Sequence, residues 1–354
     1  MKIISVVGAR PQFVKLAPLS RRLRKVADEV IVHTGQHYDA NMSDSFFEDM
    51  NIARPDYSLN VGSGRHGEQT GRMLIELEKV MMAEKPDAVV VFGDTNSTLA
   101  AALAAVKLHI KTVHVEAGLR SFNREMPEEI NRIMTDHCSD YLFAPTPIAM
   151  DNLRKENLGP KSYLFGDIMV DALLDNLDRA ESQSKIVERL ELAKRDYVLV
   201  TLHRPYNVDD PARLTQIFKN LADLPHTVVF PIHPRTRAIV AKYDIPIPEQ
   251  FVLIDPVGYL DFLKLQKHCE RILTDSGGIQ KEAYIQEKPC ITLRSETEWL
   301  ETLEVGWNIL MDPANPNLAA EVAGFSPPAA HPAVFGEQVA QKMVDFLVDL
   351  DGCD

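Results

Sequence analysis

The chain has 354 residues, of which 45% are hydrophobic and 25% are charged, and its formal net charge at pH 7 is −13. The composition is that of a globular protein, and the length predicts about two domains. No apolar run reaches the roughly 18 residues that a membrane span needs, and the acidic balance argues against a nucleic-acid surface. The apolar stretch in MKIISVVGARPQF is too short for a signal peptide and lacks a cleavage site, so we expect a first strand there.

The cysteines indicate a reducing environment. Cys138, Cys269, Cys290 and Cys353 are isolated in the sequence and show no metal-binding spacing. No pair of histidines has metal-ligand spacing with a carboxylate partner on a helix, so we expect no metal site. A cytoplasmic location fits these observations.

Short apolar runs alternate with stretches of helical period along the chain. Strands are predicted at KIISVV, EVIVHT, DAVVVF, TVHV and DYLFAP, and then at DYVLVT, TVVFPI, FVLID, RILT and PCITL. Runs that are apolar on both faces are typical of buried parallel strands, and their alternation with helices predicts α/β doubly wound sheets.

A charged helical stretch near 175–195 interrupts this pattern, which restarts at Asp196. We therefore expect two Rossmann-like domains, at about 1–170 and about 190–330. The amphipathic segment FGEQVAQKMVDFLVDL predicts a C-terminal helix, about 334–350, which we expect to join the first domain.

Ligands of doubly wound sheets bind at the carboxyl ends of the strands, so the residues that follow each strand are the candidates. GARPQFVK places Arg10 and Lys15 at a helix start, which favours anions, although both could be surface charges. Asp94 follows DAVVVFG and could instead cap the next helix.

Glu116 follows TVHV, and a carboxylate at the end of a buried strand is costly unless it is paired or used. A salt bridge from Glu116 to Arg120 or Arg132 is the alternative to a functional role. In MPEEINR, Glu128 and Arg132 are four residues apart and share one helix face, which an ordinary helix start would also show. We expect the neighbouring charges to be solvated, namely Arg124, Glu125 and Glu129.

In the second half, His203 follows VLVTL and His233 follows TVVFPI, where either could simply bond to loop backbone. Ser276, Gly277 and Gly278 follow RILTD and offer bare N–H groups at a helix start, as a phosphate-binding turn does. Glu282 lies one turn further along and could accept hydrogen bonds from ribose hydroxyls. The alternative is a glycine-rich turn that only caps the helix.

The stretch GSGRHG at 62–67 matches G-x-G-x-x-G but does not follow the first strand of either domain, so no nicotinamide site is predicted there. The sequence also lacks a G-x-x-x-x-G-K phosphate loop.

Several stretches together resemble the non-hydrolysing UDP-N-acetylglucosamine 2-epimerases. They are, in order, GARPQFVKLAP, HTGQHYD, FGDTNSTLA, HVEAGLRS, MPEEINR, TLHRPYNVD, HPRTR, DPVGYL and TDSGGIQKEA. The resemblance implies two Rossmann-like domains that face each other across a cleft, of the glycosyltransferase-B type. It also implies a homodimer, a UDP-sugar substrate and no cofactor.

The implied reaction interconverts UDP-N-acetylglucosamine and UDP-N-acetylmannosamine, by elimination and re-addition of UDP through a 2-acetamidoglucal. It needs a base near C2, an acid on the opposite face and stabilisation of the departing diphosphate. Matching the motifs assigns the catalytic residues as Asp94, Glu116, Glu128 and His203. Residues that would hold the diphosphate or the sugar are Arg10, Lys15, Arg132 and His203. Those that resemble the UDP-binding set are His233, Val257, Phe262, Ser276, Gly277, Gly278 and Glu282.

Two positions depart from many members of the family, which have Glu in place of Gln12 and Arg in place of Trp299. A subgroup that resembles this chain at both positions epimerises UDP-2,3-diacetamido-2,3-dideoxyglucuronate, so the C3 and C6 substituents of the sugar stay open. More distant alternatives are a glycosyltransferase of the same fold, a hydrolysing epimerase and a silent UDP-sugar-binding protein.

Overall fold

The computed structural model describes residues 1–36, 52–193, 195–297 and 299–352. The last three residues of the HTGQHYD motif, 37–39, lie outside this part of the chain. Two compact units divide the chain: unit 1 comprises Met1–Ala172 and Phe335–Asp354, and unit 2 comprises Leu173–Val334.

Unit 1 is built on a parallel sheet with the strand order β3-β2-β1-β4-β5-β6-β7. The strands are nearly all apolar, as expected where helices cover both faces of a sheet; β4, for example, is buried along its whole length. The bounds are β1 (Lys2–Val7), β2 (Asp28–His33), β3 (Tyr57–Ser58), β4 (Ala88–Phe92), β5 (Lys111–Val115), β6 (Tyr141–Ala144) and β7 (Ser162–Leu164).

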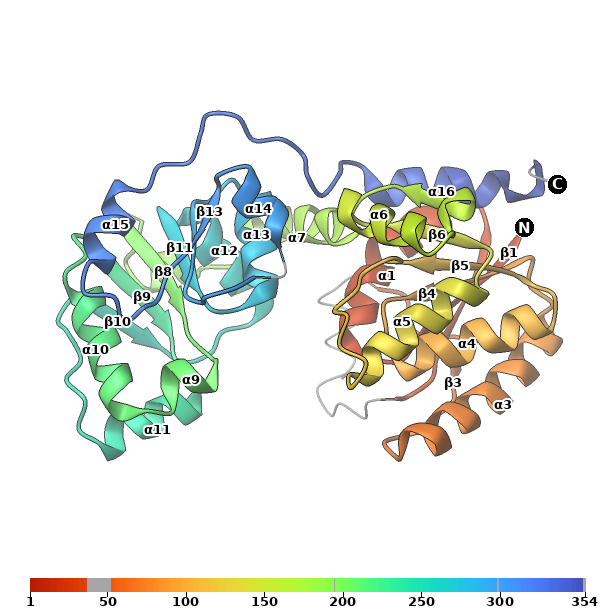
Figure 1. Cartoon of the computed structure of the whole chain (residues 1–354), viewed down its shortest axis with the longest axis horizontal. Coiled ribbons are helices and arrows are strands. Elements are labelled where there is room, and N and C mark those ends of the chain that lie inside the picture. Colours follow the sequence, from red (N-terminus) through yellow and green to blue (C-terminus); the bar gives the residue numbers. More distant parts are fainter. Residues whose placement is uncertain (37–51, 194, 298, 353–354) are drawn as a thin grey trace. The chain divides into compact units, whose positions relative to one another are not determined.

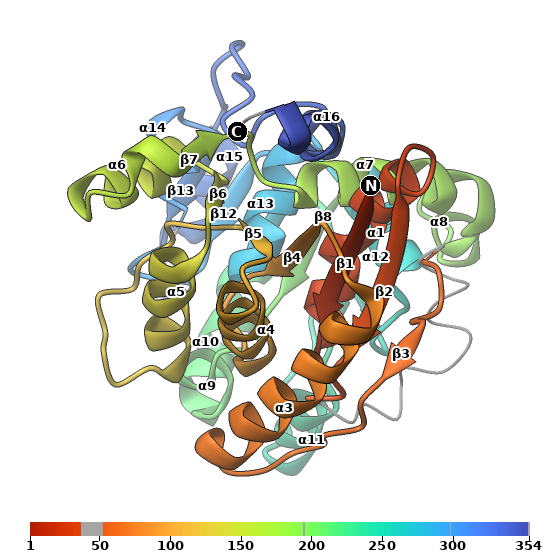
Figure 2. The same ribbon diagram turned by 90° about the vertical axis from the view of Figure 1, so that its right-hand side faces the viewer.

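Helices cover both faces of this sheet, with α3, α4 and α5 on one side and α1 and α16 on the other (Figures 1 and 2). A proline at the first or second position starts α1, α5 and α6, where its missing N–H costs nothing. The bounds are α1 (Arg10–Leu23), α3 (His66–Glu84), α4 (Asn96–Lys107), α5 (Pro127–Cys138), α6 (Pro147–Lys155), η1 (Gly159–Lys161), α16 (Val339–Val348) and η2 (Asp349–Gly352). Helix α7 (Met169–Gln183) begins in unit 1, and its residues from Leu173 onward belong to unit 2.

The chain returns to unit 1 for its last helix because α16 carries an aromatic anchor. Phe346 contacts the rings of Tyr141, Phe143 and Tyr163, with centroid distances of 5.4, 5.3 and 4.5 Å. Gly166 lies so close to the incoming segment that a Cβ there would meet the carbonyl oxygen of Phe335 at 2.5 Å.

Unit 2 holds a second parallel sheet, with the order β10-β9-β8-β11-β12-β13. Its strands are β8 (Tyr197–Thr201), β9 (Thr227–Pro231), β10 (Phe251–Ile254), β11 (Arg271–Thr274), β12 (Cys290–Thr292) and β13 (Asn308–Leu310). Its helices are α8 (Ile186–Arg189), α9 (Pro205–Val208), α10 (Pro211–Ala222), α11 (Pro234–Lys242), α12 (Tyr259–His268), α13 (Gly277–Ile285), α14 (Leu300–Glu304) and α15 (Leu318–Gly324).

Each strand predicted from the sequence is present, and the prediction of doubly wound parallel sheets is confirmed. The short strands β3, β7 and β13 were not predicted. The strand order reverses between β1 and β4 in unit 1 and between β8 and β11 in unit 2, and ligands of such sheets bind at these switch points. Among the described residues, no helix is long and apolar enough to span a membrane.

Candidate functional site

In unit 1, Glu116 follows β5 and forms an ion pair with Lys15 of α1, and the two side chains are 14% and 15% exposed. Burial lowers the pKa of Lys15, but the Glu116 carboxylate outweighs this effect and the pKa lies above its ordinary value. Glu116 has φ +73, in the left-handed region that a non-glycine residue adopts only at a cost. Strain of this kind gathers at functional sites.

Asp94 follows β4 and pairs with Arg132 of α5, with 2.5 Å between Oδ2 and Nη2. Burial lowers the pKa of Arg132, but the Asp94 and Glu129 carboxylates raise it above its ordinary value. The cap of α4 is Thr95, whose side chain accepts a hydrogen bond from the Thr98 N–H, so the capping alternative for Asp94 is wrong. The salt-bridge alternatives for Glu116 are also wrong, because its partner is Lys15.

The first turn of α5 corrects two further expectations. Glu129, expected to be solvated, is 1% exposed and accepts hydrogen bonds from the N–H groups of Ser121 and Phe122, both at 2.9 Å. Burial would raise the pKa of Glu129, but these bonds and Arg132 outweigh it and hold the pKa below its ordinary value. Arg132 bonds to Glu129 at 3.0 Å, and the helix neighbour proposed for it, Glu128, is exposed.

Arg124 and Glu125 are exposed, as predicted. Arg10 is the first residue of α1, and its side chain falls outside the described part of the structure.

The Gln12 side chain is buried and links the turn after β1 to the turn after β4. Its Oε1 accepts from the N–H groups of Gly8 and Ala9 at 2.7 and 3.1 Å. Its Nε2 donates to the carbonyl oxygen of Phe92 at 2.6 Å and to the hydroxyl of Thr98 at 3.0 Å. Gln12 therefore holds the two turns together from inside unit 1.

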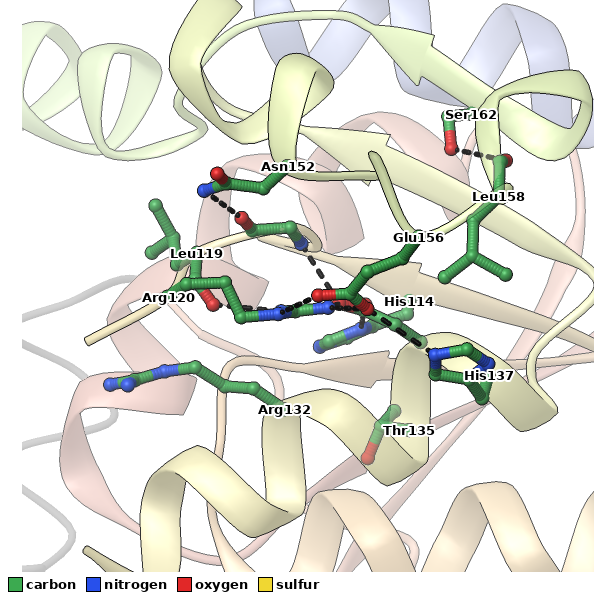
Figure 3. A network of polar contacts seen from close by, with 12 residues as sticks. His114, Leu119, Arg120, Arg132, Thr135, His137, Asn152, Glu156, Leu158 and Ser162 are labelled. Atoms are coloured by element: carbon green, nitrogen blue, oxygen red, sulfur yellow. Dashed lines mark hydrogen bonds and ion pairs between the residues drawn. The ribbon is translucent and has the colours of Figure 1, made fainter. Parts of the chain in front are cut away.

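Behind these turns runs a polar network that sequence reasoning missed, and it is buried at His114, Arg120 and Asp136 (Figure 3). His114 of β5 contacts the carboxylate of Asp136 at 2.7 Å, and Arg120 bonds to the other oxygen of the same carboxylate at 2.7 Å. Arg120 also pairs with Glu156, which His137 contacts at 3.3 Å. A histidine inside a buried strand was the available signal, because a buried imidazole needs partners.

In unit 2, the ends of the strands open onto a pocket of about 210 Å³. It brings together four predicted residues from separate parts of the sequence, His203, His233, Val257 and Phe262. Its other lining residues are Thr201, Pro231, Pro256 and Ile279. An apolar wall with a few polar groups is the usual composition of a small-molecule site.

The turn that carries His203 is organised by Asp275, which is fully buried at the end of β11. Its carboxylate accepts from the N–H groups of His203 and Arg204 and from the Asn207 side chain, at 2.9 to 3.1 Å. Burial would raise the pKa of Asp275, but the contacts with His203, Arg204 and Asn207 hold it below its ordinary value. His233 caps α11, where its Nδ1 accepts from the Arg235 N–H at 3.3 Å.

Ser276 is the residue before α13, and Gly277 and Gly278 form its first turn. The first N–H groups of a helix lack intrahelical acceptors, and a Cβ at Gly278 would meet nothing within 4 Å, so this turn is open to a ligand. Glu282 accepts from Gln266 at 2.6 Å, and burial raises its pKa. Among the described residues, no three or more His, Cys, Asp or Glu side chains gather as metal ligands.

The profile of the family described as UDP-N-acetylglucosamine 2-epimerase matches residues 21–347. The chain belongs to this family. The resemblance inferred from the ordered motifs is therefore confirmed, and so is the class of enzyme, an isomerase that acts as an epimerase.

Relatives within the family act on more than one sugar. The UDP-N-acetylglucosamine 2-epimerase of Methanocaldococcus jannaschii is 50% identical, with 88% of each chain covered. The UDP-2,3-diacetamido-2,3-dideoxy-D-glucuronate 2-epimerase of Pseudomonas aeruginosa is 49% identical, with 89% of each chain covered.

Two solved structures of the M. jannaschii enzyme cover 98% of this chain and 99% of theirs, at 45% and 46% identity, with TM-scores of 0.90 and 0.77. The second is a complex with UDP-GlcNAc and UDP. The likeness confirms the glycosyltransferase-B type of fold.

Proposed function

We propose that the protein interconverts UDP-N-acetylglucosamine and UDP-N-acetylmannosamine by inverting C2 of the sugar. The observation that carries this proposal is the pair of carboxylates, Asp94 and Glu116, at neighbouring strand ends, each joined to a cation. Family membership supports it, as does the M. jannaschii relative, which has been solved with UDP-GlcNAc and UDP.

The chemistry is an elimination followed by an addition. A base removes the C2 proton while the bond from C1 to the diphosphate oxygen breaks, which leaves a glucal with a C1–C2 double bond. A proton then returns to C2 on the opposite face, and UDP adds back at C1. The overall reaction is redox-neutral, and its activation barrier falls when proton donors and acceptors are held in place near C2.

We assign the proton-transfer groups to the four predicted residues, Asp94, Glu116, Glu128 and His203. Lys15 and Arg132 lie beside two of these carboxylates, where cations also stabilise charge that develops on a departing diphosphate. We include Arg10 in this cationic set on the strength of its motif.

We assign UDP binding to unit 2, whose pocket is lined by His233, Val257 and Phe262. Ser276, Gly277 and Gly278 at the start of α13 would donate backbone hydrogen bonds to phosphate, since a helix N-terminus favours anions. Glu282 would accept from the ribose hydroxyls.

A second candidate substrate is UDP-2,3-diacetamido-2,3-dideoxyglucuronate. The P. aeruginosa relative that acts on it is as similar to this chain as the M. jannaschii enzyme is. Gln12 does not favour one sugar by direct contact, because its amide is used inside unit 1. The Lys281 ammonium lies over the Trp299 ring, with 4.2 Å from Nζ to the ring centre.

We also propose a homodimer that works in the cytoplasm. The free thiols of Cys138, Cys269 and Cys290 are in keeping with a reducing compartment. Light scattering after size-exclusion chromatography should give about twice the chain mass of 39.7 kDa. The mass of a single chain would overturn the dimer without affecting the proposed reaction.

Incubation with UDP-N-acetylglucosamine in D2O, followed by NMR, tests the function. The proposal predicts deuterium at C2 and a mixture with the manno epimer. A parallel incubation uses UDP-2,3-diacetamido-2,3-dideoxyglucuronate. Deuterium exchange at C2 of this sugar alone would select the second substrate, and exchange in neither sugar would overturn the epimerase assignment. Release of free monosaccharide would indicate the hydrolysing alternative.

A further inference from the structure

His114 is fully buried on β5, two residues before Glu116. Its Nε2 lies 2.7 Å from the carbonyl oxygen of Gly93, and its Nδ1 lies 2.7 Å from Oδ1 of Asp136. A carbonyl oxygen can only accept a hydrogen bond, so Nε2 carries a hydrogen. The two ring nitrogens of His114 therefore connect β5 to the Gly93 carbonyl and to the Asp136 carboxyl group.

Asp136 makes two further contacts inside unit 1. Its Oδ2 accepts from the N–H of Gly118 at 3.1 Å and from the guanidinium of Arg120 at 2.7 Å. Burial would raise the pKa of Asp136, but His114 and Arg120 outweigh it and the pKa lies below its ordinary value. The buried carboxyl group of Asp136 thus joins His114, Arg120 and the Gly118 amide.

His114 and Asp136 form hydrogen bonds with the backbone next to Asp94 and Glu116. Gly93 directly precedes Asp94, and its carbonyl, held by His114, sets the plane of the peptide that enters Asp94. The Gly118 N–H, held by Asp136, anchors the turn that leaves Glu116. Both turns are in left-handed conformations, with φ +65 at Gly93 and φ +73 at Glu116. Such conformations persist where the surroundings over-determine them.

We propose that His114 and Asp136 are positioning residues for the epimerisation, because their buried hydrogen bonds hold the turns from which Asp94 and Glu116 project. They act through the Gly93 carbonyl and the Gly118 amide and do not themselves touch the sugar. This inference rests on the proposed function, which assigns the C2 chemistry to Asp94 and Glu116.

The test compares Asp136→Asn, His114→Gln and the double variant with the wild-type enzyme. The wild type is assayed first, in whichever of the two UDP-sugars it exchanges deuterium at C2; exchange in neither overturns the proposed function and this inference with it. Each variant is then measured for kcat, KM, affinity for UDP and thermal midpoint. The thermal midpoint reports on folding, and UDP affinity reports on the pocket that the proposal assigns to unit 2.

Glu156→Gln is the matched control. The Glu156 side chain is 27% exposed and pairs with Arg120 (Figure 3). Its replacement leaves the contacts of Asp136 with His114 and Gly118 in place. We expect the kcat of this variant to stay within about twofold of the wild type, because no contact to either turn is lost.

A positioning role predicts that kcat falls about 100-fold in each single variant, since a misplacement of about 1 Å can cost that much. KM and UDP affinity should change by less than about threefold, and the double variant should lose no more than the worse single one, because the pair acts as a unit. A wild-type kcat in folded Asp136→Asn or His114→Gln would overturn the inference. If Asp136→Asn does not fold, His114→Gln alone decides it.

Discussion

Replacing Gly93 with alanine should perturb the turns that carry Asp94 and Glu116 without removing a functional group. Gly93 has φ +65, where alanine is strained, and a Cβ there would meet Oε2 of Glu116 at 3.3 Å and Nζ of Lys15 at 3.4 Å. These atoms end flexible side chains, so a shift of a few tenths of an ångström would relieve the contact. The substitution therefore moves the side chains of Glu116 and Lys15, and Glu116 is one of the proposed proton-transfer groups.

The expected cost in stability is modest and the expected cost in rate is larger. A left-handed conformation costs a residue with a Cβ about 1–2 kcal/mol, so Gly93→Ala should lower the free energy of unfolding of unit 1 by about that amount. Because a misplacement of about 1 Å can cost ~100-fold in rate, a smaller displacement of Glu116 and Lys15 should lower kcat by about tenfold or more. UDP affinity should fall by less than kcat, because the UDP-binding residues proposed in unit 2 are unchanged.

Gly71→Ala is the matched control. Gly71 lies on the exposed face of α3, where an added Cβ would meet nothing within 4 Å. Alanine is favoured over glycine in helices by about 1 kcal/mol, so this variant should gain stability and keep its kcat. Urea unfolding, UDP titration and C2 exchange by NMR measure the three quantities. If Gly93→Ala keeps a wild-type kcat, the geometry of Glu116 and Lys15 is not coupled to the reaction.

Glu116→Gln should keep UDP affinity while kcat falls by about 100-fold or more, the usual share of one acid–base group; unchanged turnover would remove Glu116 from the catalytic set. Glu282→Gln should weaken UDP binding about tenfold, because a neutral acceptor replaces a charged one. Burial raises the pKa of Glu282 in the folded state, so ionisation costs stability as the pH rises, and Glu282→Gln should be the more stable protein above the ordinary glutamate pKa of 4.5 but not below it. Asp136 and Asp275 each have a pKa below the ordinary aspartate value of 3.8, so the stability they contribute is present above pH 3.8 and is lost as the pH falls further. Acid unfolding of Asp136→Asn should accordingly be less steep below 3.8 than that of the wild type, and equal slopes would contradict this assignment.

The sheets could be predicted because buried parallel strands are nearly continuous apolar runs. The short strands β3, β7 and β13 could not, because two or three residues carry too little pattern. Asp94 and Glu116 could be singled out as candidates because polar residues after buried strands collect at one edge of a sheet.

The partners of these carboxylates could not be predicted, because pairing depends on contacts between distant segments. Lys15 is 101 residues away from Glu116 in sequence, whereas the nearby Arg120 is taken by Asp136. The position of Glu129 in the first turn of α5 predicted a solvated acid. In the structure the loop before α5 folds back over Glu129, and the N–H groups of Ser121 and Phe122 donate to its carboxylate.

In the proposed elimination, C1–O cleavage and C2 proton exchange occur in one reaction. UDP-N-acetylglucosamine labelled with ¹⁸O at the bridging oxygen of C1, incubated in D2O, reports both steps by NMR. We predict that the label appears in the non-bridging β-phosphate positions while deuterium enters C2 of both epimers. Epimerisation with the label still in the bridge, or with protium retained at C2, would contradict the elimination mechanism.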